Sequence, residues 1–133
     1  MAPYRISIEC DYREFWRYNL ALSGEVRADG SRVGYIAYTD DVAAVGSQLS
    51  SAPAGYKRPR RTVVEGAAGD ALTLYIYIVP NTLPESRIVA DSAPFEVAVS
   101  ISHGDSVVYN RRLLINQWSG DNIEIKLGDV ARG

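Results

Sequence analysis

The chain lacks most of the residues on which small enzymes and metalloproteins depend. It has one cysteine, Cys10, and one histidine, His103, among 133 residues. A single cysteine excludes an internal disulfide, and one cysteine with one histidine falls short of a closed zinc site. His103 lies in a Ser-His-Gly-Asp turn without a nucleophile elbow, so a histidine-dependent triad is not expected. We predict no metal site and no cofactor.

Further absences narrow the function. Gly66 and Gly69 lack the lysine and the helix that follow a phosphate-binding loop, and no Asp-x-Asp pair suggests calcium loops. No apolar run approaches the roughly 18 residues of a membrane span, and no signal-peptide pattern is visible, so we expect a cytoplasmic protein. A net charge of −2 gives no general attraction to nucleic acid.

What the chain does have is a series of short segments in which apolar and polar residues alternate, the period of a half-buried strand. This profile predicts an all-β fold, an antiparallel β-sandwich of about eight strands in one domain over residues 1–133, with a closed small barrel as the alternative. The expected strands are 4–10, 16–26, 33–37, 62–65, 72–79, 95–101, 107–115 and 123–127.

Three segments carry more specific expectations. Residues 40–49 have apolar side chains at 42, 45 and 49, which predicts one short helix in a connecting loop. Residues 72–79 are almost continuously β-branched, aromatic or aliphatic, so this strand should be central and covered on both faces. One of Phe15 and Trp16 should face outward, because neighbouring side chains of a strand point to opposite faces.

Tight turns and long connections alternate along the chain. The tight turns fall at 28–31, 66–70 and 102–105, and the long or unusual connections at 39–60, 80–93 and 116–120. If successive strands are antiparallel, every second connection emerges at the same end of the molecule. The sequence therefore predicts one plain end and one elaborated end.

The densest cluster of charge, Lys57-Arg58-Pro59-Arg60-Arg61, lies in one of the long connections. Arginine and exposed tryptophan concentrate binding energy at interfaces, and both types occur in the connections of the elaborated end. The candidate binding residues are Tyr56, Lys57, Arg58, Arg60, Arg87, Asn116, Gln117 and Trp118.

From these observations we expect a non-enzymatic module that binds another macromolecule, a protein, through the long loops or through a sheet edge. Exposed sheet edges also invite pairing between two copies of the chain, which would give a homodimer. One alternative is a carbohydrate- or small-ligand-binding module, in which some of the nine tyrosines stack on sugar rings. A third is a hydrolase with a carboxylate pair, either Glu65 with Glu96 or Glu9 with Glu25.

Overall fold

A computed structural model describes residues 1–84 and 93–128 of the chain. Eight strands form two four-stranded sheets in which every pairing is antiparallel, and this confirms the predicted all-β sandwich. In chain order the elements are β1 (Pro3–Cys10), the 3₁₀ turn η1 (Phe15–Arg17), β2 (Tyr18–Ala28), β3 (Ser31–Asp40), β4 (Arg60–Ala68), β5 (Ala71–Pro80), β6 (Phe95–His103), β7 (Ser106–Ile115) and β8 (Asp121–Gly128).

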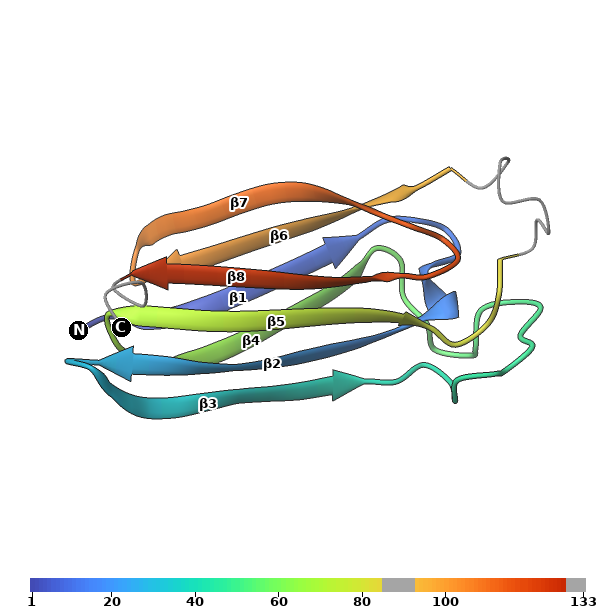
Figure 1. Cartoon of the computed structure of the whole chain (residues 1–133). Coiled ribbons are helices and arrows are strands. Elements are labelled where there is room, and N and C mark those ends of the chain that lie inside the picture. Colours follow the sequence, from blue (N-terminus) through green and yellow to red (C-terminus); the bar gives the residue numbers. More distant parts are fainter. Residues whose placement is uncertain (85–92, 129–133) are drawn as a thin grey trace.

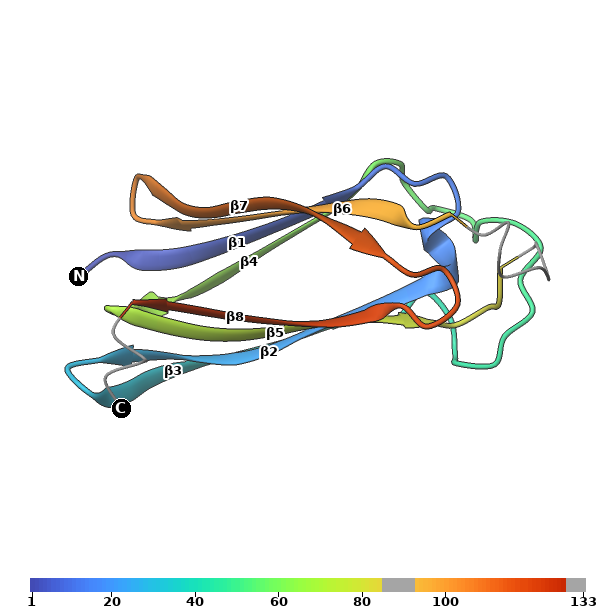
Figure 2. The ribbon, with the colours of Figure 1, turned by 45° about the horizontal axis from the view of Figure 1, so that its top comes forward.

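The two sheets lie face to face (Figure 2), one in the order β4-β1-β6-β7 and the other in the order β3-β2-β5-β8. Tight turns join β2 to β3, β4 to β5 and β6 to β7 at one end, which we call the turn end. The β1–β2, β3–β4 and β7–β8 connections lie at the opposite end, where β5 also ends and β6 begins; we call it the loop end (Figure 1). The predicted division into two ends is therefore present.

The core consists of the inward-facing side chains of both sheets, including Ile6 and Ile8 of β1 and Leu74, Ile76 and Ile78 of β5, each at most 2% exposed. Burial alternates along these strands as the sequence predicts. β5 is central in its sheet, but its outward face is only half-buried and Val79 is exposed. The prediction that both faces of this strand are covered is wrong.

The helix predicted at 40–49 is also wrong. β3 continues to Asp40, and residues 41–50 form bends and turns. The Asn19 side chain accepts hydrogen bonds from the backbone N–H groups of Val42 and Ala43 and donates one to the Ala43 carbonyl. Gly46 takes a φ of 93°, a left-handed conformation that interrupts an α-helix. Contacts with β2 therefore satisfy the backbone groups that a helix would have used.

The only helical segment in the described part of the chain is η1, which begins where a strand was expected. Phe15 and Trp16 are 1% and 5% exposed, so both are buried and neither faces outward. A strand sends adjacent side chains to opposite faces, whereas a tight helical turn does not impose that alternation. Within residues 1–84 and 93–128, no helix has the length and apolar character needed to cross a bilayer.

Candidate functional site at the loop end

The loop end holds the buried polar groups of the sandwich. In the described part of the chain, the buried polar or charged residues are Arg17, Asn19, Arg60, Thr62, Asn81 and Thr82. All six lie in the connections of the loop end or near the strand ends that adjoin these connections. A buried polar group is costly unless it is hydrogen-bonded, so the contacts of these residues define how the loops are held.

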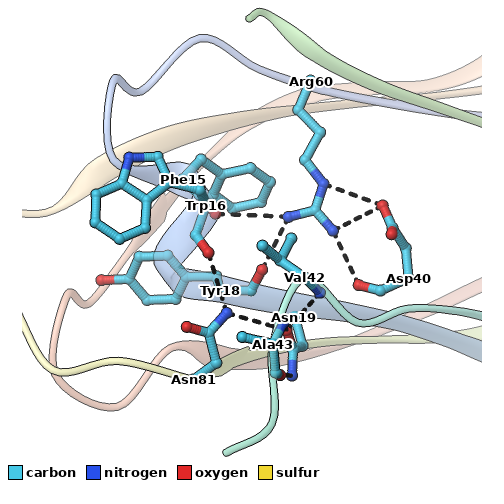
Figure 3. Close-up of polar contacts among 9 residues, drawn as sticks. All are labelled: Phe15, Trp16, Tyr18, Asn19, Asp40, Val42, Ala43, Arg60 and Asn81. Atoms are coloured by element: carbon cyan, nitrogen blue, oxygen red, sulfur yellow. Dashed lines mark hydrogen bonds and ion pairs between the residues drawn. The ribbon is translucent and has the colours of Figure 1, made fainter. Parts of the chain in front are cut away.

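Arg60 joins three strands. Its Nη1 donates to the Tyr18 carbonyl at 2.8 Å, and its Nη2 donates to the Asp40 carboxylate at 2.8 Å and to the Asp40 carbonyl at 3.0 Å (Figure 3). The guanidinium also lies over the Phe15 ring, 4.9 Å from its centroid. Because the side chain is only 7% exposed and its donors are engaged within the protein, Arg60 is part of the framework, although it also borders the hollow of the basic segment.

A second buried arginine ties η1 to the end of β5. Arg17 donates to Glu14 Oε1 at 3.0 Å and to the Leu83 carbonyl at 2.7 Å, and its guanidinium covers the Trp16 ring. The Arg17 carbonyl accepts the backbone N–H of Asn81 at 2.7 Å. These hydrogen bonds therefore hold the β1–β2 connection against the start of the β5–β6 connection.

Asn19 and Asn81 complete this network (Figure 3). Asn81 Nδ2 donates to the Trp16 carbonyl at 3.0 Å and to Asn19 Oδ1 at 3.1 Å. Asn19 in turn binds the backbone at Val42 and Ala43, as described above. Two asparagine side chains thus connect η1, β2, β5 and the β3–β4 connection, which makes the position of each loop depend on the others.

The basic segment lies at the start of β4. Lys57 and Arg58 are exposed, and Arg58 Nε donates to Asp11 Oδ1 at 2.9 Å. Together with Arg61, they line a hollow of about 580 Å³. The Tyr56 hydroxyl, in contrast, is buried without a hydrogen-bond partner, and burial raises its pKa. Tyr56 therefore directs its polar atom into the protein and not toward a ligand.

The second predicted segment forms the β7–β8 turn. Asn116 is exposed, and its Oδ1 accepts the backbone N–H groups of Trp118 and Ser119, which fixes the turn. Gln117 is half-buried; its carbonyl accepts the Tyr18 hydroxyl at 2.6 Å, and its Nε2 donates to the Ala93 carbonyl. Trp118 is half-buried. Arg87, the remaining candidate, lies outside the described residues.

The structure places these two segments at the same end but on opposite sides of it. The basic segment adjoins β4, one edge of its sheet, and residues 116–118 follow β7, the other edge. Asp11 lies between them, since it pairs with Arg58 and also lines a hollow of about 570 Å³ together with Gln117. The loop end thus presents two adjoining hollows with the Asp11–Arg58 pair between them.

A third and larger hollow was not predicted. It measures about 750 Å³ and lies between Glu14 and Arg17 on one side and residues 45–50 and 80–84 on the other. The sequence did not predict this hollow because residues 40–49 were expected to form a helix, whereas residues 45–50 form one wall of the hollow. The clearest signal in the sequence was Asn81, a polar residue directly after a strongly apolar strand.

The chemistry available to this site is limited. The described residues contain no group of three or more potential metal ligands. Burial raises the pKa of the Cys10 thiol to about 11, so it is a poor nucleophile near neutral pH. His103 lies at the turn end, where its Nε2 is 2.7 Å from the Gly69 carbonyl and its ring stacks on Tyr4.

The proposed carboxylate pairs are not assembled. Glu9 and Glu25 lie on the outer faces of different sheets, with the core between them. Glu65 is opposite Arg5, whereas Glu96 lies beyond the pairing of Glu9 with Ala98, about 20 Å away along β1. A glycosidase pair needs a separation of about 5–10 Å. Neither pair can act on one bond.

Comparison with known proteins finds no matching family model, no matching curated protein and no matching solved structure.

Proposed function

We propose that the chain is a non-enzymatic recognition module that binds another protein through its loop end. The observation that carries this proposal is the concentration of buried polar residues there, because Arg17, Asn19, Arg60 and Asn81 hold three connections in fixed positions. Loops fixed before binding lose less conformational entropy when a partner docks. Tight turns such as those of the turn end keep their conformation without a network of this kind.

The accessible groups at this end suit a protein partner with an acidic contact. Lys57, Arg58 and Arg61 surround one hollow, and each is exposed. The ion pairs of Arg58 with Asp11 and of Arg61 with Glu9 are largely solvent-exposed, so they contribute little and can be exchanged for contacts with a partner. The half-buried Trp118 and the hollow that Gln117 lines add apolar area on the other side of the same end.

Lysine footprinting tests the proposal, because the two lysines of the chain lie at different ends. Lys57 is at the loop end, and Lys126 lies on β8 opposite Thr73, toward the turn end. Partners are captured from extracts of the organism that makes the protein, and acetylation of both amines is compared in the free and bound states. We expect protection of Lys57 and unchanged labelling of Lys126; the reverse pattern contradicts the proposal.

A matched pair of variants provides a second test. Arg58→Glu and Arg5→Glu each reverse one exposed guanidinium that pairs with one carboxylate. Arg58 belongs to the loop end, whereas Arg5 lies on the outer face of β1 near the turn end. We expect at least about tenfold weaker partner binding for the first variant and no change for the second. Equal effects of the two reversals would place the contact elsewhere.

A further inference from the structure

The four edge strands of the sandwich lie in pairs along its two sides. β7 and β8 follow one side, and β3 and β4 follow the other (Figure 1). On the second side the sheets approach closely, since a Cβ added at Gly34 of β3 would lie only 2.9 Å from the Ala67 Cβ of β4. β3 and β4 therefore pack against each other, and β7 and β8 do so less.

The backbone of β7 is unpaired along its outer edge. β7 pairs with β6 on one side, and no strand within residues 1–84 and 93–128 pairs with it on the other. The pairing with β6 is regular over Tyr109–Ile115, a stretch of about 23 Å. The N–H and C=O groups that point away from β6 form a template for one more extended chain.

The inner row of β7 is also incompletely covered. Every inward-facing residue of the neighbouring strand β6 is at most 6% exposed, whereas Tyr109 and Leu113 of β7 are half-buried and Arg111 is exposed. A strand placed about 4.8 Å beyond β7 would cover Tyr109 and Leu113. Such a strand would therefore gain apolar burial in addition to main-chain hydrogen bonds.

The charge of β7 sets it apart from the other three edge strands. Each of those carries both signs: Arg32 and Asp40 on β3, Arg60, Arg61 and Glu65 on β4, and Asp121, Glu124 and Lys126 on β8. β7 carries Arg111 and Arg112 and no acidic residue. Because the two arginines are adjacent in a strand, one lies on each face of the sheet.

Both arginines are accessible to a partner. Arg112 lies 3.6 Å from Glu96, but the two side chains are 75% and 58% exposed, so this pair contributes little and can be exchanged. The Arg111 guanidinium lies 5.6 Å from the centre of the Tyr109 ring, and it forms no ion pair with a carboxylate in the described part of the chain. The edge thus offers one cation on each face.

The same charges disfavour a second copy of the chain at this edge. Pairing of two β7 strands would bring four arginines into one strand pair, and like charges on facing strands are destabilising. Pairing of β7 with β8 of another copy would set the inward Arg111 beside the apolar inner row of β8, which is Ile123, Ile125 and Leu127. That row offers no acceptor to a charge that becomes buried.

We propose that β7 binds an acidic protein segment, which adds to the β4-β1-β6-β7 sheet as a fifth strand. Its main chain pairs with the free edge of β7, and two neighbouring carboxylates, one on each face, meet Arg111 and Arg112. Its apolar side chains cover Tyr109 and Leu113. This surface runs along the side of the sandwich and does not depend on the partner proposed for the loop end.

The test is NMR of the ¹⁵N-labelled chain with capped eight-residue peptides, in which a central Glu-Glu pair is flanked by valine, isoleucine and threonine. At least one peptide should give saturable shifts in β6 and β7 and slow the exchange of alternate β7 amides by about tenfold or more. The proposal is overturned if none saturates, or if the shifts map to β3, β4, β8 or the loop end. Protection of β7 that grows with protein concentration without peptide would identify a second copy, and would also overturn it.

Two modified peptides separate the backbone contribution from the charge contribution. Methylation of every second backbone nitrogen can be placed on either edge of the bound peptide. One methylated form should bind like the parent and the other at least about tenfold more weakly, because only one edge of the added strand faces β7. Replacement of Glu-Glu by Lys-Lys should weaken binding by a similar factor. Equal binding of the two methylated forms, or of the acidic and basic peptides, would refute strand addition to a basic edge.

A charge exchange makes the assignment specific to β7. Arg111→Glu should weaken binding of the acidic peptide at least about tenfold and strengthen binding of the basic peptide, a gain that a misfolded variant cannot show. Arg32→Glu is the matched control, because Arg32 is a partly exposed arginine on β3, the edge strand of the other sheet. This control should leave both affinities unchanged. The same response of the two variants would contradict the proposal.

Discussion

Substitution of Arg60 by methionine should destabilise the protein far more than the same change at the next residue. Methionine keeps the aliphatic length of the side chain and its packing on Phe15, but it removes the donors to Asp40 and to the Tyr18 carbonyl. Loss of one member of a buried ion pair typically costs about 3–5 kcal/mol, because the remaining polar groups stay buried and unpaired. Asp40 is 40% exposed and keeps some hydration, so the lower half of that range applies.

Arg61→Met is the control. Arg61 pairs with Glu9 at 3.0 Å, but its side chain is 68% exposed, and such surface pairs contribute about 0–1 kcal/mol. Urea denaturation of both variants gives the two free energies of unfolding from the midpoints and slopes. Since a domain is stabilised by only about 5–15 kcal/mol, a loss of 3 kcal/mol is readily measured. Equal losses in the two variants would refute the view that Arg60 organises the loop end.

Three further predictions concern single residues. Tyr56→Phe removes a buried hydroxyl that has no partner, so the free energy of unfolding should stay the same or rise by about 1 kcal/mol in urea denaturation; a loss above 1 kcal/mol would indicate a hidden partner. The pKa of the Cys10 thiol is about 11 in the fold and near 9 in the unfolded chain. The free energy of unfolding should therefore fall between pH 9 and 11, and it should fall less steeply in Cys10→Ala, as measured by denaturation at several pH values. Gly120→Ala should lower the free energy of unfolding by about 2–4 kcal/mol in thermal unfolding, because φ is 65° there and a Cβ would overlap the Ile78 carbonyl. Gly30→Ala should lower it by only about 1–2 kcal/mol, because φ is 80° but the space around the residue is open.

The strands were predictable because their signal is local. Alternation of apolar and polar residues identified β1 at 4–10, against Pro3–Cys10 in the structure, and the order of short and long connections predicted the two ends. Both properties depend only on the period of a strand and on antiparallel pairing, which leave a direct trace in the sequence.

The errors arose where distant contacts decide the conformation. Residues 40–49 have the apolar spacing of a helix, but the Asn19 side chain, more than twenty residues away, takes up their backbone groups. A basic segment normally lies in solvent, but Arg60 is buried because it donates hydrogen bonds to the Tyr18 carbonyl and the Asp40 carboxylate. For β5, tyrosine is as common on a half-buried face as on a covered one, so composition alone does not predict that Tyr75 and Tyr77 are uncovered.

The position of Met1 has a practical consequence for handling the protein. The N-terminus emerges beside the tight turns, at the opposite pole from the connections that hold Lys57 and Trp118 (Figure 1). A biotin or fusion partner attached to Met1 therefore orients an immobilised molecule with those connections toward the solution. Coupling through surface amines would instead scatter orientations, because Lys57 would compete as an attachment point.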